Sequence, residues 1–192
     1  MTQYYYLVAS LPLLIFDASA PLASPTFLEM CREQAAAPDH ALLCRIALDA
    51  PAARPGDAAA WRTYAAWETA LRDELALQRA QRLGRDPQPF LRPAPFFAGL
   101  PGVAREALAA GTPREVEEAL DRRRWARLEE LEAGTQFDLD RLVVYRLKLL
   151  LLERRDRWRP EPGRAAFAKG YAGILDRAAS WANTAPAPAD TE

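Results

Sequence analysis

The sequence predicts an all-α protein, a bundle of long helices with one extended segment near the N-terminus and a packed, proline-rich loop. Stretches rich in alanine, leucine, arginine and glutamate, all strong helix formers, recur between proline and glycine breaks. Strand signals are confined to Tyr4–Ala9, which we expect to be an extended segment or short strand. The 192 residues and 50% hydrophobic content suit one domain with a sizeable core. We therefore predict a single helical domain over 1–183 and a disordered tail over 184–192.

Three consecutive tyrosines, Tyr4 to Tyr6, begin an apolar run close to the N-terminus. A terminus frays unless it is tied down, so these rings are expected to dock onto the body of the protein or onto a partner. A secretion signal is disfavoured because the first cationic side chain is Arg32, and Pro12 and Asp17 interrupt the apolar run. We expect mature, folded sequence here.

The first helix is expected to begin at Ser24, with the serine side chain as its cap and Pro25 in the first turn. It should run to about Ala36, because Pro38 interrupts the helical pattern. A short segment over Asp39–Asp49 follows.

The second long helix should start at the cap Asp57, after a proline-containing linker over Ala50–Gly56, and end near Gly84. Glycine there suits a left-handed C-cap. Between Arg85 and Pro101 the prolines are too dense for a helix or strand, and the interleaved phenylalanines predict that this loop is packed.

The clearest helix start is a capping box at Thr112 and Glu115, and that helix should reach about Ala133. A further helix is expected over Asp138–Arg159, with Asp138 as its cap, and a last one over Gly163–Ala182. The tail after it holds prolines and acidic residues, a composition typical of disorder.

The helix over 138–159 is apolar on more than half of its circumference, so we expect it to be central. Arg146 falls in the middle of this apolar arc, where a guanidinium needs an acidic partner. The candidates are Glu68, on the helix expected between Asp57 and Gly84, and an acid supplied by a partner protein. If Arg146 is paired inside the fold, Arg146→Leu should cost roughly 3 to 5 kcal/mol.

Arg124 and Arg127 share the apolar stripe of the capping-box helix. One interpretation is that their stems pack while their charged heads reach solvent or pair with Glu129 and Glu130. The other is that this helix meets another protein through mixed arginine and leucine contacts.

Composition and motifs disfavour several classes of function. Two cysteines, Cys31 and Cys44, and the single histidine His40 cannot supply the usual zinc ligands. We expect both cysteines to be buried thiols in a reducing compartment. The motifs GxGxxG, GxxxxGK[ST] and GxSxG are absent, and we assign no catalytic, cofactor-binding or metal-binding residue.

The net charge of -1 gives no field that favours nucleic acid, and the arginine clusters over 121–127 and 154–159 are interspersed with acids. No stretch reaches the roughly 18 apolar residues that span a bilayer. We therefore expect a cytoplasmic protein that neither binds nucleic acid nor inserts into the membrane.

Several segments together resemble an uncharacterised bacterial family encoded with the subunits of V/A-type rotary ATPases. They are YYYLVASLP over Tyr4–Pro12; Trp67, Glu68, Leu71, Arg72, Glu74, Leu75, Arg79 and Ala80; and Phe137, Asp138, Asp140, Tyr145, Lys148 and Leu149. The resemblance extends to about Trp158 and rests on packing patterns.

The resemblance implies a non-catalytic accessory or central-stalk subunit that acts by contacts with other ATPase subunits. Its candidate counterpart is the helical component of V-type ATPases that joins the central shaft to the membrane rotor ring. Such a protein would lie in the cytoplasm, peripheral to the inner membrane through the ATPase, and self-association stays open. The alternative is a small helical enzyme or ligand-binding protein whose polar centre combines Arg146, Glu68, Tyr145 and Lys148.

Overall fold

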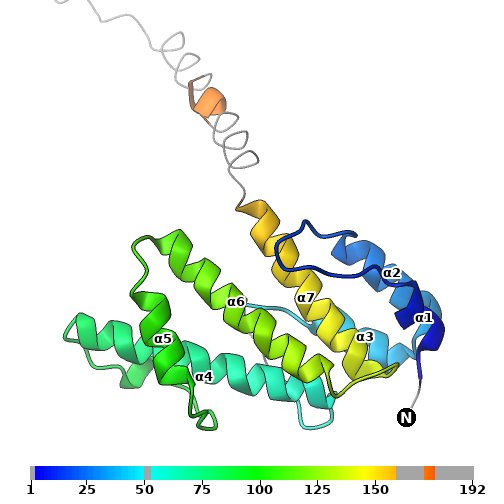
Figure 1. Cartoon of the computed structure of the whole chain (residues 1–192), viewed down its shortest axis with the longest axis horizontal. Coiled ribbons are helices and arrows are strands. Elements are labelled where there is room, and N and C mark those ends of the chain that lie inside the picture. Colours follow the sequence, from blue (N-terminus) through cyan, green and yellow to red (C-terminus); the bar gives the residue numbers. More distant parts are fainter. Residues whose placement is uncertain (1–2, 50–52, 159–170, 176–192) are drawn as a thin grey trace, which may run out of the picture. The chain divides into compact units, whose positions relative to one another are not determined.

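The computed structural model describes residues 3–49, 53–158 and 171–175. The chain divides into two compact units, residues 1–153 and 154–192. Every regular element in the described ranges is a helix, which confirms the predicted all-α class (Figure 1). Residues 171–175 are helical, whereas the rest of the predicted last helix and the tail lie outside the described residues.

The predicted strand at the N-terminus is wrong, because this segment forms the short helix α1, Tyr5–Ser10. An isolated strand would leave its backbone N–H and C=O groups without a ladder, whereas a helical turn pairs them locally. The segment is anchored by Tyr4, whose backbone N–H donates to the Phe137 carbonyl at 2.5 Å and whose hydroxyl donates to Asp39. Tyr4 and Leu7 are buried, but Tyr6 is 89% exposed.

Helices α2, Ser24–Gln34, and α3, Ala37–Arg45, follow the predicted order, with a proline in the first turn of each. Ser24 is not the cap of α2, because Ala23 takes that position. The serine hydroxyl and backbone N–H instead donate to the Glu153 carboxylate at 2.6 and 2.5 Å. A carboxylate at this helix N-terminus is stabilised by the helix dipole and satisfies its first donors.

Helix α4, Ala59–Arg82, ends as predicted near Gly84, whose φ of 61° is left-handed. Asp57 does not cap it, since Ala58 is the N-cap residue. The Asp57 carboxylate instead accepts hydrogen bonds from the Arg45 side chain at 2.7 Å and the Arg54 backbone N–H at 2.8 Å. The acid therefore ties together the segment that precedes the helix.

The proline-rich segment contains the short 3-10 helix η1, Gln88–Phe90, and leads into helix α5, Leu100–Leu108, which the sequence patterns did not predict. The prediction that the proline-rich segment is packed is wrong in large part, because Phe90 is exposed and Phe96 is 83% exposed. Phe97 alone of the three phenylalanines here is partly buried against the core. Arg92 holds the segment to α4 through Asp73, which accepts its backbone N–H at 3.0 Å.

Helix α6, Pro113–Glu132, begins with the predicted capping box, in which Thr112 accepts the Glu115 N–H at 3.2 Å and Glu115 accepts the Thr112 N–H at 2.8 Å. Helix α7, Leu139–Arg157, is also close to its prediction, and Asp138 accepts the Arg141 N–H at 2.9 Å as an N-terminal cap. Both boundaries were correct because capping chemistry marks them in the sequence.

Helix α7 is central in the first unit, as predicted, and its side chains are buried around most of its circumference. Helices α2 and α3 lie on one side of it, and α6 and α4 on another (Figure 1). Phe27 of α2 stacks on Tyr145 of α7 with ring centres 5.3 Å apart. The Asp140 carboxylate of α7 accepts the backbone N–H of Ala60 in α4 at 2.8 Å. Helix α5 packs against α4 and α6.

Candidate functional site

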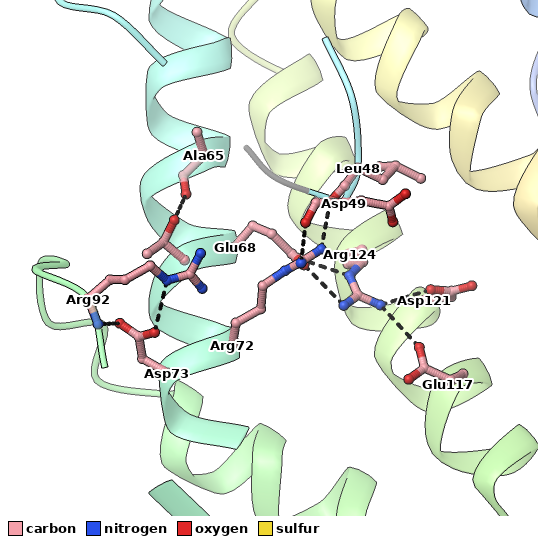
Figure 2. A network of polar contacts seen from close by, with 11 residues as sticks. Leu48, Asp49, Ala65, Glu68, Arg72, Asp73, Arg92, Glu117, Asp121 and Arg124 are labelled. Carbon is pink, nitrogen blue, oxygen red and sulfur yellow. Dashed lines mark hydrogen bonds and ion pairs between the residues drawn. The ribbon is translucent and has the colours of Figure 1, made fainter. Parts of the chain in front are cut away.

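Glu68 is the centre of a buried ion-pair network between α4 and α6 (Figure 2). Its carboxylate accepts hydrogen bonds from Arg124 Nε at 3.0 Å and Arg124 Nη2 at 3.1 Å. Arg72, one turn along α4, donates from Nε to the same carboxylate at 2.8 Å. One fully buried carboxylate is thus shared by two guanidinium groups, a geometry that compensates the loss of water around it.

The interpretation in which the charged head of Arg124 reaches solvent or pairs with Glu129 and Glu130 is wrong. Arg124 is buried, and its third nitrogen, Nη1, donates to Asp121 at 3.0 Å and lies 3.8 Å from Glu117. Burial alone would lower the pKa of Arg124, but the charge and hydrogen bonds of Glu68 outweigh that effect and raise it. The guanidinium therefore stays charged and fully engaged inside the fold.

Arg72 extends this network to the end of the segment that follows α3. It donates to the backbone carbonyls of Leu48 at 2.6 Å and Asp49 at 2.5 Å (Figure 2). The network therefore connects α4, α6 and the chain just before residue 50. Its charges and donors are directed at one another, as in a structural network that fixes how helices pack.

Arg146 is buried in the apolar arc of α7 as predicted, but its predicted pairing with Glu68 is wrong, because Glu68 is taken by Arg124 and Arg72. Within the described residues Arg146 makes no hydrogen bond or ion pair, and its Nε and Nη1 atoms are buried without a partner. Burial lowers the pKa of its guanidinium. The stability loss expected for Arg146→Leu requires an internal ion-pair partner. Such partners are present for Arg124, so the loss is expected on substitution of Arg124 instead.

Lys148 and Tyr145 lie on a different face of α7, beside the segment that follows α1. Lys148 is buried, pairs with Glu132, and places its Nζ 4.8 Å from the centre of the Trp125 ring. The Tyr145 hydroxyl donates to the Pro12 carbonyl at 3.0 Å. Burial raises the pKa of Tyr145 to about 12.

These two side chains help to line a cavity of about 290 Å³ between residues 8–14 and helices α6 and α7. Glu132 in its wall also forms an ion pair with Arg141, whose Nη1 lies 2.7 Å from Oε1. The charged side chains that line the cavity are two acids, Glu129 and Glu132, and two bases, Arg141 and Lys148, so their charges balance. The predicted polar centre of Arg146, Glu68, Tyr145 and Lys148 is therefore divided among three places.

Arg127 agrees with one of its interpretations, since its Nη1 pairs with Glu130 at 2.6 Å near the surface of α6. Glu129 is engaged differently, because it accepts the indole N–H of Trp125 at 2.8 Å. The two predicted acids thus have separate roles.

The two cysteines are free thiols in different environments. Cys31 on α2 is buried as predicted, and burial raises the pKa of its thiol to about 12. Cys44 on α3 is exposed, against prediction, with its sulfur 3.5 Å from His40 Nε2.

No group of three or more His, Cys, Asp or Glu side chains in the described ranges is arranged to hold a metal ion. None of the helices described here is long and apolar enough to cross a bilayer.

The sequence patterns missed Asp121, Arg72 and Glu132 as polar partners, although two of the three carried a signal. Asp121 is three residues before Arg124, and Arg72 is four residues after Glu68, spacings that bring side chains together on a helix. Glu132 meets Lys148 only through the packing of α6 on α7, which local spacing does not encode.

Comparisons of the chain with protein-family models, with curated proteins and with solved structures find no match.

Proposed function

We propose that this chain acts through protein–protein contacts as a non-catalytic accessory or central-stalk subunit associated with a bacterial V/A-type rotary ATPase. The observation that carries the proposal is the exposure of apolar side chains on the N-terminal segment, which also carries the strongest part of the family resemblance. Tyr6 and Leu13 are 89% and 81% exposed, and Tyr5 and Ile15 are also exposed. Large apolar side chains gathered on an anchored segment are typical of a surface that a partner covers.

The anchoring of this segment supports a binding role over fraying. Tyr4 is fixed through Asp39 and the Phe137 carbonyl, while the Tyr5 ring packs at a tilt against Phe137 with ring centres 4.6 Å apart. A pre-organised segment loses little conformational entropy on association. The segment therefore offers its outward side chains in a fixed arrangement.

The buried charges support a structural role for the rest of the candidate residues. Glu68, Arg124 and Lys148 find their partners inside the fold, and the polar centre that the alternative enzyme or ligand-binding function required is not assembled. In the proposed function the chain is a cytoplasmic protein, held at the periphery of the inner membrane by the ATPase subunits it contacts.

A pair of matched variants tests the surface. Tyr6→Ser combined with Leu13→Ser should weaken binding to purified central-stalk subunits of the ATPase from the same cell by at least about tenfold, since hot-spot apolar residues each cost more than 1 kcal/mol when truncated. Leu83→Ser, at an exposed apolar position just beyond α4, is the control and should bind as the unaltered chain does. Failure of the unaltered chain to bind any ATPase subunit would refute the proposal.

A further inference from the structure

Arg146 is a buried cation that forms no ion pair or hydrogen bond within the described part of the chain. The residue is 7% exposed, and neither Nε nor Nη1 has a hydrogen-bond partner. A buried unpaired guanidinium is costly, because desolvation of the charge is not compensated by hydrogen bonds. Native proteins leave few such groups, so each calls for an explanation.

The guanidinium lies on the side of α7 that faces α2 and α3. The groups that act electrostatically on Arg146 are Glu153, from α7 itself, and the thiols of Cys44 and Cys31, from α3 and α2. Glu153 is occupied, since it accepts both the backbone N–H and the hydroxyl of Ser24 at the start of α2. Glu153 therefore spends its hydrogen bonds on a helix terminus and acts on Arg146 through its charge alone, without a direct ion pair.

The basic residues near Arg146 in sequence are directed elsewhere. Arg141 and Lys148 both pair with Glu132, the last residue of α6, on another side of α7. Arg146 thus supplies a single positive charge on the apolar arc of α7, near the Cys31 and Cys44 thiols and the Glu153 carboxylate. A single guanidinium matches one carboxylate, with two parallel N–H donors to two oxygens, in charge as well as in shape.

We infer that Arg146 is the binding site for a carboxylate that a partner protein supplies at the side of α7 next to α2 and α3. Cys44 is exposed whereas Cys31 is fully buried, so the carboxylate approaches from the α3 side. The identity of the partner as an ATPase subunit rests on the proposed function. The carboxylate site itself rests only on the burial and missing partner of Arg146.

The first test compares two buried arginines in the isolated full-length chain. Arg146→Met removes a buried charge that has no ion pair or hydrogen bond in the described chain and keeps the apolar stem, so its thermal unfolding midpoint should be at or above that of the unaltered chain. Arg124→Met, the matched control, breaks existing ion pairs and should lower the midpoint. A lower midpoint for Arg146→Met would mean that the guanidinium is already satisfied within the chain and would overturn the inference.

The second test adds a carboxylate at Cys44 chemically. Iodoacetate attaches a carboxymethyl group and iodoacetamide its neutral isostere, while Cys31 is protected by full burial and a pKa of about 12. The carboxymethyl chain should unfold at a higher temperature than the carbamidomethyl chain, and this difference should vanish in Arg146→Met. An equal difference in both backgrounds would overturn the inference, and Cys44→Ser controls for reaction elsewhere.

The third test measures binding to purified central-stalk subunits. Arg146→Met should weaken it by at least roughly 30-fold, because a buried charge pair would lose one partner. Arg32→Met, at an exposed arginine of α2 whose ion pair is with Glu29, should leave binding unchanged. Unaltered binding by Arg146→Met would overturn the carboxylate site and leave the proposed function standing. Failure of the unaltered chain to bind would refute the proposed function, and the labelling experiment would then decide the site alone.

Discussion

Arg124→Met is the perturbation that tests the buried network most severely. Methionine retains most of the apolar stem and removes the guanidinium, so the change isolates the ion pairs from the packing. The substitution deletes two hydrogen bonds to Glu68 and one to Asp121, all at 3.0 to 3.1 Å and all between buried groups.

The expected loss in the free energy of unfolding depends on which partners Glu68 keeps once the Arg124 guanidinium is removed. Removing one member of a buried pair costs about 3 to 5 kcal/mol, because its partner is left as an uncompensated charge. Glu68 keeps Arg72, which donates from Nε at 2.8 Å, so the loss should be near the lower end, about 3 kcal/mol. For a chain of this size that corresponds to a fall of roughly 6 to 12 °C in the unfolding midpoint.

Urea denaturation followed by circular dichroism measures the loss, with Arg72→Met as a comparison. Arg72 is partly exposed, so its removal should cost less than removal of Arg124. The double variant Glu68→Met, Arg124→Met should be more stable than the sum of the single losses predicts, by about 1 to 3 kcal/mol. An unchanged free energy of unfolding for Arg124→Met would refute the claim that this network fixes the packing of α4 on α6.

Three further predictions concern the capping box and the two thiols. Thr112→Ala should lower the free energy of unfolding by about 1 kcal/mol, because the Glu115 N–H at the start of α6 loses its acceptor, and Thr112→Ser should restore most of it; equal stability of all three chains would contradict the capping geometry. In the native chain a thiol reagent should label Cys44 alone, with both cysteines reacting only after denaturation. Because the Cys31 pKa is about 12 in the folded state and near 9 when unfolded, the unfolded chain loses this proton first, so this thiol's contribution to stability should fall from pH 9 towards 12. Cys31→Ala should lack this component of the pH dependence, and an identical slope in both chains would count against it.

The helices that the sequence predicted best are those whose ends carry local chemistry. The capping box at Thr112, the cap at Asp138 and the left-handed Gly84 all depend on residues within one turn, so sequence spacing is sufficient to find them. Ser24 and Asp57 have the same cap-forming side chains, yet tertiary partners draw them into other bonds. A cap predicted from residue type alone fails when a distant acid or arginine competes for it.

The candidate site was predictable in its residues but not in its pairing. Arg146, Arg124 and Glu68 could each be located on or beside apolar helical stripes, and the predicted burial of Arg146 is confirmed, whereas Arg124 is buried against prediction. Which arginine meets Glu68 depends on how α4 crosses α6 and α7, and helix crossing is set by packing across the whole interface. The prediction of a strand in the N-terminal segment was wrong for a related reason. An apolar aromatic run forms a strand only where another strand can pair with it by hydrogen bonds.

Affinity purification of the chain at native expression, with identification of the proteins recovered, tests the central claim most directly. The proposed function predicts that V/A-type ATPase subunits are recovered with the unaltered chain and are lost from the Tyr6→Ser, Leu13→Ser variant. Recovery of the unaltered chain without any ATPase subunit would contradict it.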